Sequence, residues 1–141
     1  MPGKRFSAGA VVVRPFPEGW RYLLLRVYRT WDFPKGRVES RETPLQAAVR
    51  EVEEETMLND LQFRWGEAYS ETLPYSSGKI ARYYLAESPA QAAALPINAE
   101  LGRAEHHEFR WVRADEAERL LPERLQPVLA WARTLVDPKG D

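Results

Sequence analysis

The chain has 141 residues, of which 44% are hydrophobic and 29% are charged, and its formal net charge is −1. This length and balance are typical of a globular protein with its own core, so we expect residues 1–141 to form a single domain. The near-zero charge favours no nucleic-acid partner, and the absence of cysteine excludes disulfides, thiol catalysis and cysteine-bound metals.

The first predicted elements are two strands that form a hairpin. Residues 8–13 are rich in valine, which is typical of a buried strand, and residues 20–28 resume the apolar pattern after a turn at 15–19. The run at 8–13 is far shorter than the roughly 20 residues that span a bilayer. Arg14 and Pro15 also end it too soon for a secretory signal. We therefore expect a cytoplasmic protein with no membrane partner.

The middle of the chain contains the clearest helix signal. Thr43 is a good N-cap, Pro44 suits the first helical position, and Gln46 completes a capping box. These signals predict a helix from Pro44 to about Glu55.

Further strands and a loop are predicted after this helix. Residues 72–87 indicate a second hairpin with its turn at 76–78, and residues 107–112 alternate as a strand does. The alanine-rich residues 88–96 are expected to be a loop or a short surface helix.

Two more helices are predicted near the end of the sequence. Asp115 is followed three residues later by Glu118, which matches a capping box, so we expect a helix to open at Asp115. The last helix should begin near Pro127, because proline is tolerated in a first helical turn.

Three glutamates share one face of the middle helix. Successive helical residues are offset by 100°, so Glu51, Glu54 and Glu55 occupy one arc while Glu53 points away. Such neighbouring like charges repel by roughly 0.2–0.5 kcal/mol per pair. A hard divalent cation such as Mg²⁺ or Mn²⁺ would remove this penalty. The alternative is a solvated acidic face that binds no metal.

Residues 36–58 resemble the signature of the Nudix hydrolase family. That signature is Gly, five residues, Glu, seven residues, then Arg-Glu-apolar-x-Glu-Glu-x-Gly-apolar, and the matching positions here are Gly36, Glu42, Arg50, Glu51, Val52, Glu54, Glu55 and Leu58. Met57 stands where the family has its second glycine, and Arg41 stands where many members have glycine. The resemblance implies an α+β fold, an α/β/α sandwich around a mixed central β-sheet.

The resemblance also implies roles for the matching residues. Glu51, Glu54 and Glu55 would hold Mg²⁺, or Mn²⁺, together with the backbone carbonyl of Gly36. Arg50 would orient Glu51 through a charge-assisted hydrogen bond, the alternative being a surface ion pair.

Two other glutamates receive roles by the same resemblance. Glu42 would steady the loop before the helix. The general base would be a glutamate of the helix or Glu105 in the later segment, with Glu108 as the fallback; a solvated loop acid is the alternative for both.

The substrate prediction depends on two further segments. Residues 31–36, Trp-Asp-Phe-Pro-Lys-Gly, are similar to the diadenosine polyphosphate hydrolase branch of the family. By the same similarity, Tyr83 would lie near a nucleobase, although core packing in a strand is the alternative. Lys35 and Lys79 are candidates for binding the polyphosphate chain.

The leading hypothesis is therefore an enzyme that hydrolyses a dinucleoside polyphosphate, acting as a monomer or a homodimer with a nucleotide as its only expected partner. Rival substrates are nucleoside triphosphates, the 5′ end of RNA and diphosphoinositol phosphates. A catalytically silent domain that senses a nucleotide is a rival of another class. The complete set of arginine and glutamates argues against silence, whereas Met57 is the one feature in its favour. An acidic interaction helix without metal would leave the Gly36–Glu42 spacing unexplained.

Overall fold

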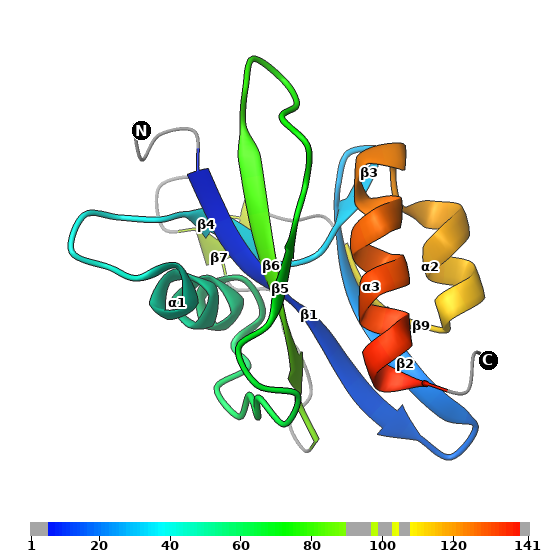
Figure 1. Cartoon of the computed structure of the whole chain (residues 1–141). Helices are drawn as coiled ribbons and strands as arrows, with labels where there is room; N and C mark the ends of the chain where they lie inside the picture. The colour runs from blue at the N-terminus through cyan, green and yellow to red at the C-terminus, as the bar shows by residue number, and fades with distance from the viewer. Residues whose placement is uncertain (1–5, 90–96, 99–102, 105–107, 139–141) are drawn as a thin grey trace.

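The computed structural model describes residues 6–89, 97–98, 103–104 and 108–138. Its elements, in chain order, are β1 (Phe6–Phe16), β2 (Gly19–Val27), β3 (Thr30–Asp32), β4 (Lys35–Arg37), α1 (Pro44–Thr56), β5 (Tyr69–Glu71), β6 (Ile80–Glu87), β7 (Ile97–Asn98), β8 (Arg103–Ala104), β9 (Glu108–Val112), α2 (Ala114–Leu120), the 3₁₀ turn η2 (Glu123–Leu125) and α3 (Gln126–Val136). Figure 1 shows their arrangement.

A mixed β-sheet lies between two helical layers. Its main strand order is β3-β2-β1-β6-β5, with β4 also paired to β1 and β9 to β2. The central pair β1 and β6 is parallel, whereas β1 with β2 and β5 with β6 are antiparallel. Helix α1 covers one side of this sheet, and α2 and α3 cover the other (Figure 1). The predicted α+β fold with a mixed central sheet is confirmed.

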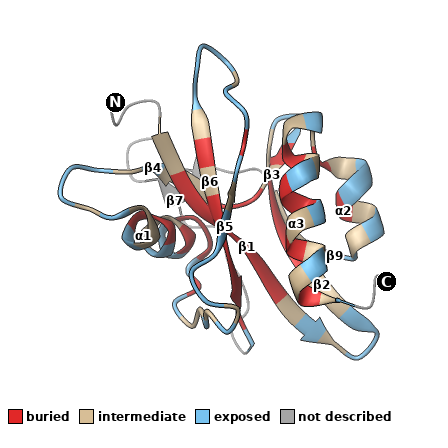
Figure 2. Cartoon of the chain, in the orientation of Figure 1, coloured by how far each residue is buried: buried red, intermediate tan, exposed pale blue. Residues whose placement is uncertain are grey.

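Strand β1 supplies both cores of the sandwich. Successive side chains of a strand point to opposite faces. Val12 accordingly packs with Val52 of α1, whereas Val11 packs with Leu129 of α3. Buried segments occupy both sides of the sheet in Figure 2. Burial on both faces explains why this strand reads as a continuous apolar run rather than as an alternating one.

The structure confirms the first predicted hairpin and the helix at 44–55. The second hairpin is present with its turn at 76–78, but its first strand, β5, lies at Tyr69–Glu71, before the predicted residue 72. One helix start is also corrected. Helix α2 begins at Ala114 with Arg113 as its N-cap, and no side chain caps it. Asp115 lies inside the first turn, where its carboxylate accepts a hydrogen bond from the N–H of Glu116 at 2.9 Å. The predicted capping box with Glu118 is therefore wrong.

Several expectations about the remaining segments can also be placed. Helix α3 contains Pro127 in its first turn, as predicted. Residues 90–96, most of the predicted alanine-rich segment, lie outside the described residues. None of the helices in the described ranges is both long enough and apolar enough to cross a membrane.

The two departures from the signature both fall at left-handed backbone positions. Met57 caps α1 with φ 64° and ψ 11°, and its N–H donates to the carbonyl of Glu53 at 2.7 Å. Arg41 has φ 70°. Glycine is favoured in this conformation because a Cβ atom crowds the backbone there. The glycines of the family signature thus have a conformational reason at both positions.

Met57→Gly is expected to raise the free energy of unfolding by about 0.5–1 kcal/mol. The Met57 side chain is 56% exposed, so little packing is lost with it. Urea denaturation of both proteins measures the change. Glu53→Gly, in the same helix but at an ordinary helical position, should instead lower stability. A Met57→Gly protein no more stable than the parent would contradict the strain argument.

Candidate active site

The site lies where β4 pairs with β1 and leads towards α1. Gly9 of β1 lies opposite Lys35 of β4. A Cβ atom on Gly9 would overlap the carbonyl of Pro34 and the Lys35 side chain. Only glycine allows this approach, and it lets the N–H of Ala10 donate to the carbonyl of Pro34 at 3.1 Å. Pro34 and Lys35, at the start of β4, are thereby held against β1.

The Glu51 carboxylate lies directly against Gly36, in the space that a side chain at that position would fill. A Cβ atom on Gly36 would overlap the carboxyl carbon and both oxygens of Glu51. Helix α1 packs against both β1 and β4, and this packing places the Glu51 side chain against β4. The first glycine of the signature is therefore required for the close contact with the Glu51 carboxylate.

Arg50 connects the loop to the glutamates of α1. Its Nε and Nη2 atoms donate to the two oxygens of Glu42 at 2.7 and 3.0 Å. Its Nη2 also donates to the carbonyl of Arg37 at 2.9 Å. Its Nη1 donates to Glu51 at 2.8 Å and to Glu54 at 3.2 Å. The guanidinium is thus in position to orient Glu51, as the family resemblance implied, rather than forming one surface ion pair.

Glu42 has the structural position expected of it. The hydrogen bond from Arg50 holds the pKa of Glu42 below its usual value, with help from the N–H of Glu39. That N–H donates to Glu42 at 3.0 Å. The carboxylate therefore ties the loop to the helix in its ionised form.

Two acidic side chains of α1 are largely shielded from solvent. The side chain of Glu51 is 13% exposed, and Glu55 is 8% exposed as a residue. Burial raises the pKa of Glu51, while its hydrogen bonds to Arg50 and Glu55 and the charge of Arg50 oppose the rise. Glu55 accepts a further hydrogen bond from the N–H of Lys35 at 3.2 Å. Buried neighbouring acids are costly unless a cation compensates them.

The donor set fits a hard divalent cation. Glu51 offers carboxylate oxygens that lie against Gly36, and Glu55 offers an oxygen that accepts from the N–H of the adjacent Lys35. Within the described ranges, no group of three acidic or histidine side chains is close enough to hold an ion alone. Glu54 is instead 58% exposed beside Arg50. Mg²⁺ needs only one or two carboxylates, because waters and substrate phosphates complete its shell.

A pocket opens beside Glu55. It has a volume of about 190 Å³ and is lined by Leu25, Val27, Thr30, Asp32, Phe33, Lys35 and Glu55. A larger cavity of about 440 Å³ lies at the far end of the sheet, between the β1–β2 turn and the ends of α2 and α3. None of the predicted site residues lines that larger cavity, so the smaller one is the candidate substrate pocket.

The structure places the residues predicted to bind substrate at different distances from the pocket. Lys35 lines the pocket, with its Nζ atom 3.8 Å from Asp32. Lys79 lies in the β5–β6 turn, where its N–H donates to the carbonyl of Tyr75 at 2.7 Å, and it does not line the pocket. Glu105 lies outside the described residues.

The interpretation of Tyr83 as a base-stacking residue is corrected by its burial. Tyr83 is 0% exposed, its ring meets Phe33 edge-on at 5.5 Å, and its hydroxyl donates to Asp32 at 2.8 Å. No face of the ring is open to a base. Burial and the neighbouring Asp32 charge raise the pKa of Tyr83 well above its usual value, so the phenol stays protonated as a donor.

A family model for the NUDIX domain matches residues 4–132. The chain belongs to the Nudix family.

Similar proteins include two kinds of enzyme. A bis(5'-nucleosyl)-tetraphosphatase [asymmetrical] of Caenorhabditis elegans is 31% identical over 117 residues, which are 79% of this chain and 80% of that protein. The Sus scrofa protein of the same name is 36% identical over 62% of this chain and 58% of its own length. An octanoyltransferase of Myxococcus xanthus is 40% identical over 85% of this chain, but only 30% of its own length. The chain therefore spans only part of some curated relatives it matches.

Solved Nudix structures have the same fold. A C. elegans Ap4A hydrolase in a binary complex aligns with a TM-score of 0.79 and 24% identity, covering 94% of this chain and 98% of that one. The MutT protein of Methanosarcina mazei aligns with a TM-score of 0.66 and 21% identity over 94% of both chains. At these identities the likeness supports the fold and not the substrate.

Sequence reasoning missed one residue next to the Nudix site. Arg124 of η2 lies 3.2 Å from Asp32, which lines the pocket, although the two residues are 92 positions apart. Nothing in the local sequence around either residue indicates this pairing.

Proposed function

We propose that this Nudix protein hydrolyses a phosphoanhydride bond in a dinucleoside polyphosphate, with Mg²⁺ as its cofactor and Mn²⁺ as a substitute. The observation that carries the proposal is the pair Glu51 and Glu55. Gly36 and Arg50 contact Glu51, and the buried Glu55 lines a pocket together with Lys35. A buried acidic pair next to a lysine suits a cation and a phosphate better than it suits stability alone.

Each side chain of the site would have its own role in the proposed reaction. Glu51 and Glu55, with the carbonyl of Gly36, would hold Mg²⁺, which when bound activates water and neutralises phosphate charge. Arg50 would keep Glu51 ionised and oriented. Lys35 would bind a phosphate oxygen in the pocket. The exposed Glu54 would complete the metal shell or remove a proton from the attacking water, a role for which Glu105 is the alternative.

The dinucleoside substrate is preferred on the strength of the relatives. Two of them are named as bis(5'-nucleosyl)-tetraphosphatases, and the C. elegans protein aligns over 80% of its length. The rivals remain a nucleoside triphosphate, the 5′ end of RNA and a diphosphoinositol phosphate. The structure offers one argument against a catalytically silent sensor: Arg50 contacts the functional glutamates, which a sensor would not need to orient.

A substrate panel with and without divalent cation is expected to show hydrolysis of diadenosine tetraphosphate in Mg²⁺ and none in EDTA. Products are read by chromatography for diadenosine tetra- and hexaphosphate, ATP, capped RNA and a diphosphoinositol phosphate. Mn²⁺ should restore activity after EDTA. Cleavage of ATP or capped RNA alone would reject the dinucleoside substrate and keep the Nudix chemistry. Cleavage of none of them would favour the sensor.

A further inference from the structure

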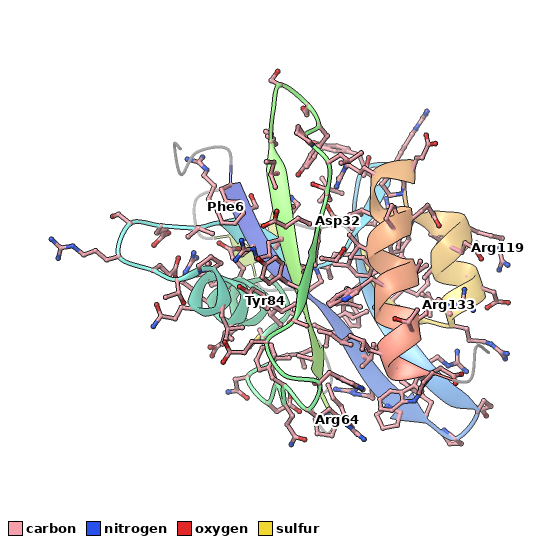
Figure 3. The ribbon with its side chains drawn as sticks, in the orientation of Figure 1. Phe6, Asp32, Arg64, Tyr84, Arg119 and Arg133 are labelled. Atoms are coloured by element: carbon pink, nitrogen blue, oxygen red, sulfur yellow. The ribbon has the colours of Figure 1, made fainter. Side chains whose placement is uncertain are left out.

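Asp32 lies at the meeting point of four structural elements. Its Oδ1 accepts hydrogen bonds from the hydroxyl of Tyr83 at 2.8 Å and from the N–H of Phe33 at 2.6 Å. Its Oδ2 lies 3.2 Å from Nη2 of Arg124 and 3.8 Å from Nζ of Lys35. Figure 3 shows Asp32 between the β5–β6 hairpin and the helical layer of α3. One carboxylate oxygen is therefore shared by two cations.

Arg124 is held in place independently of the pocket. Its guanidinium lies 4.2 Å from the ring centre of Tyr75 in the β5–β6 hairpin. Its Nη1 atom is buried, with no hydrogen-bond partner among the described residues. Such a partly buried cation depends on a nearby anion, and Asp32 is the anion that it contacts. Arg124 does not line the pocket, whereas its ion-pair partner Asp32 does, so Asp32 links Arg124 to the pocket.

The two cations compete for the same carboxylate oxygen. Arg124 is the closer partner and neutralises much of the Asp32 charge, which leaves Lys35 at the outer limit of an ion pair. A loosely held lysine can turn towards an anion in the pocket at little cost. Without the charge of Arg124, Lys35 would be the one close cation that the described residues offer to Asp32, and the Asp32 carboxylate would hold the Lys35 ammonium instead of leaving it to a phosphate in the pocket.

We propose that Arg124 is a positioning residue that makes Lys35 available to substrate phosphate by neutralising Asp32. This inference rests on the proposed function in one respect, the role of Lys35 in phosphate binding. It extends the site to a residue of the opposite helical layer that touches no substrate. Its distinctive consequence is that Arg124 should matter only while Lys35 is present.

The test compares three changes at or near this network. Arg124→Met removes the charge, Arg124→Lys keeps it, and Arg119→Met removes an exposed arginine on the outer side of α2 (Figure 3). Arg124→Met is expected to raise KM about fivefold with kcat nearly unchanged, which corresponds to about 1 kcal/mol of binding. Arg124→Lys should restore most of the affinity, and Arg119→Met should change nothing. A purely structural defect would reduce kcat or the folded fraction instead.

A second measurement separates this inference from the proposed function. The Kd for ATP with Mg²⁺ is measured in a Glu54→Gln background, in which turnover is expected to stop. Arg124→Met and Lys35→Met should each weaken binding, and the double change should be no weaker than Lys35→Met alone, because interacting sites are not additive. Additive effects, or no effect of Arg124→Met, would overturn the inference. The expected binding pattern, together with no hydrolysis of any substrate in the panel by the parent protein, would overturn the proposed function alone.

Discussion

Gly36→Ala is expected to reduce kcat/KM by about 100-fold or more, because a shift of about 1 Å in a reacting group can cost that much. The added Cβ would occupy the space of the Glu51 carboxylate. That carboxylate cannot simply turn away, because Arg50 holds it at 2.8 Å and its side chain is only 13% exposed. Steady-state hydrolysis of diadenosine tetraphosphate measures the loss, and circular dichroism reports whether the fold is kept.

Gly66→Ala is the matched control for this prediction. Gly66 has φ 84°, and an added Cβ would meet no atom within 4 Å. That change should cost about 1 kcal/mol of stability through backbone strain and leave hydrolysis intact. Full activity in Gly36→Ala would mean that the contact between the glycine and Glu51 does not set the catalytic geometry. Equal losses in both variants would point to stability rather than to the site.

Local signals account for the parts that were predictable from sequence. The capping box of α1 involves Thr43 and Gln46, and both of its hydrogen bonds are present at 2.9 and 3.1 Å. Helical spacing predicts that Glu51 and Glu55 share one face of α1, and in the structure both meet β4, Glu51 against Gly36 and Glu55 at the N–H of Lys35. Interactions within about one turn of helix depend little on the rest of the chain, so they can be inferred from spacing.

The facing of strand side chains was not predictable in the same way. Tyr83 and Tyr84 are neighbours in β6 and must point to opposite faces of the sheet. Pairing with β1 directs Tyr83 into the core under α3 and Tyr84 into the core under α1. The sequence alone contains no information on which tyrosine faces which layer. The expected base-stacking role was therefore assigned to a core residue.

The hydrogen bonds and ion pairs of Asp32 could not be predicted from the sequence for a related reason. Its partners Tyr83 and Arg124 are 51 and 92 positions away along the chain. The surroundings of the three glutamates of α1 were equally unpredictable: Glu54 is exposed beside Arg50, and no three acidic side chains of the described residues gather closely enough to hold an ion. The tertiary fold determines which cation each carboxylate contacts. In α1, the Nη1 atom of Arg50 donates to both Glu51 and Glu54.

Glu54→Gln is expected to reduce Mg²⁺-dependent hydrolysis by about 100-fold or more, the usual scale for loss of a general base or of a metal-binding carboxylate. The side chain is 58% exposed and makes one contact of 3.2 Å to Arg50, so the isosteric amide should leave stability within about 0.5 kcal/mol of the parent. Glu51→Gln is a poorer test of chemistry, because that buried carboxylate also carries a short hydrogen bond from Arg50. Steady-state kinetics and urea denaturation measure the two quantities on the same preparations.

Glu53→Gln is the control that makes the result of Glu54→Gln specific. Both residues are exposed, adjacent in α1 and equally charged, so the two variants change the net charge and the helix alike. Only Glu54 reaches the guanidinium that orients Glu51. A large loss confined to Glu54→Gln would therefore assign the effect to the position of one carboxylate rather than to the acidity of the helix. If both variants kept full activity, Glu54 would have no part in the reaction, and the pair Glu51 and Glu55 would have to hold the metal ion without it.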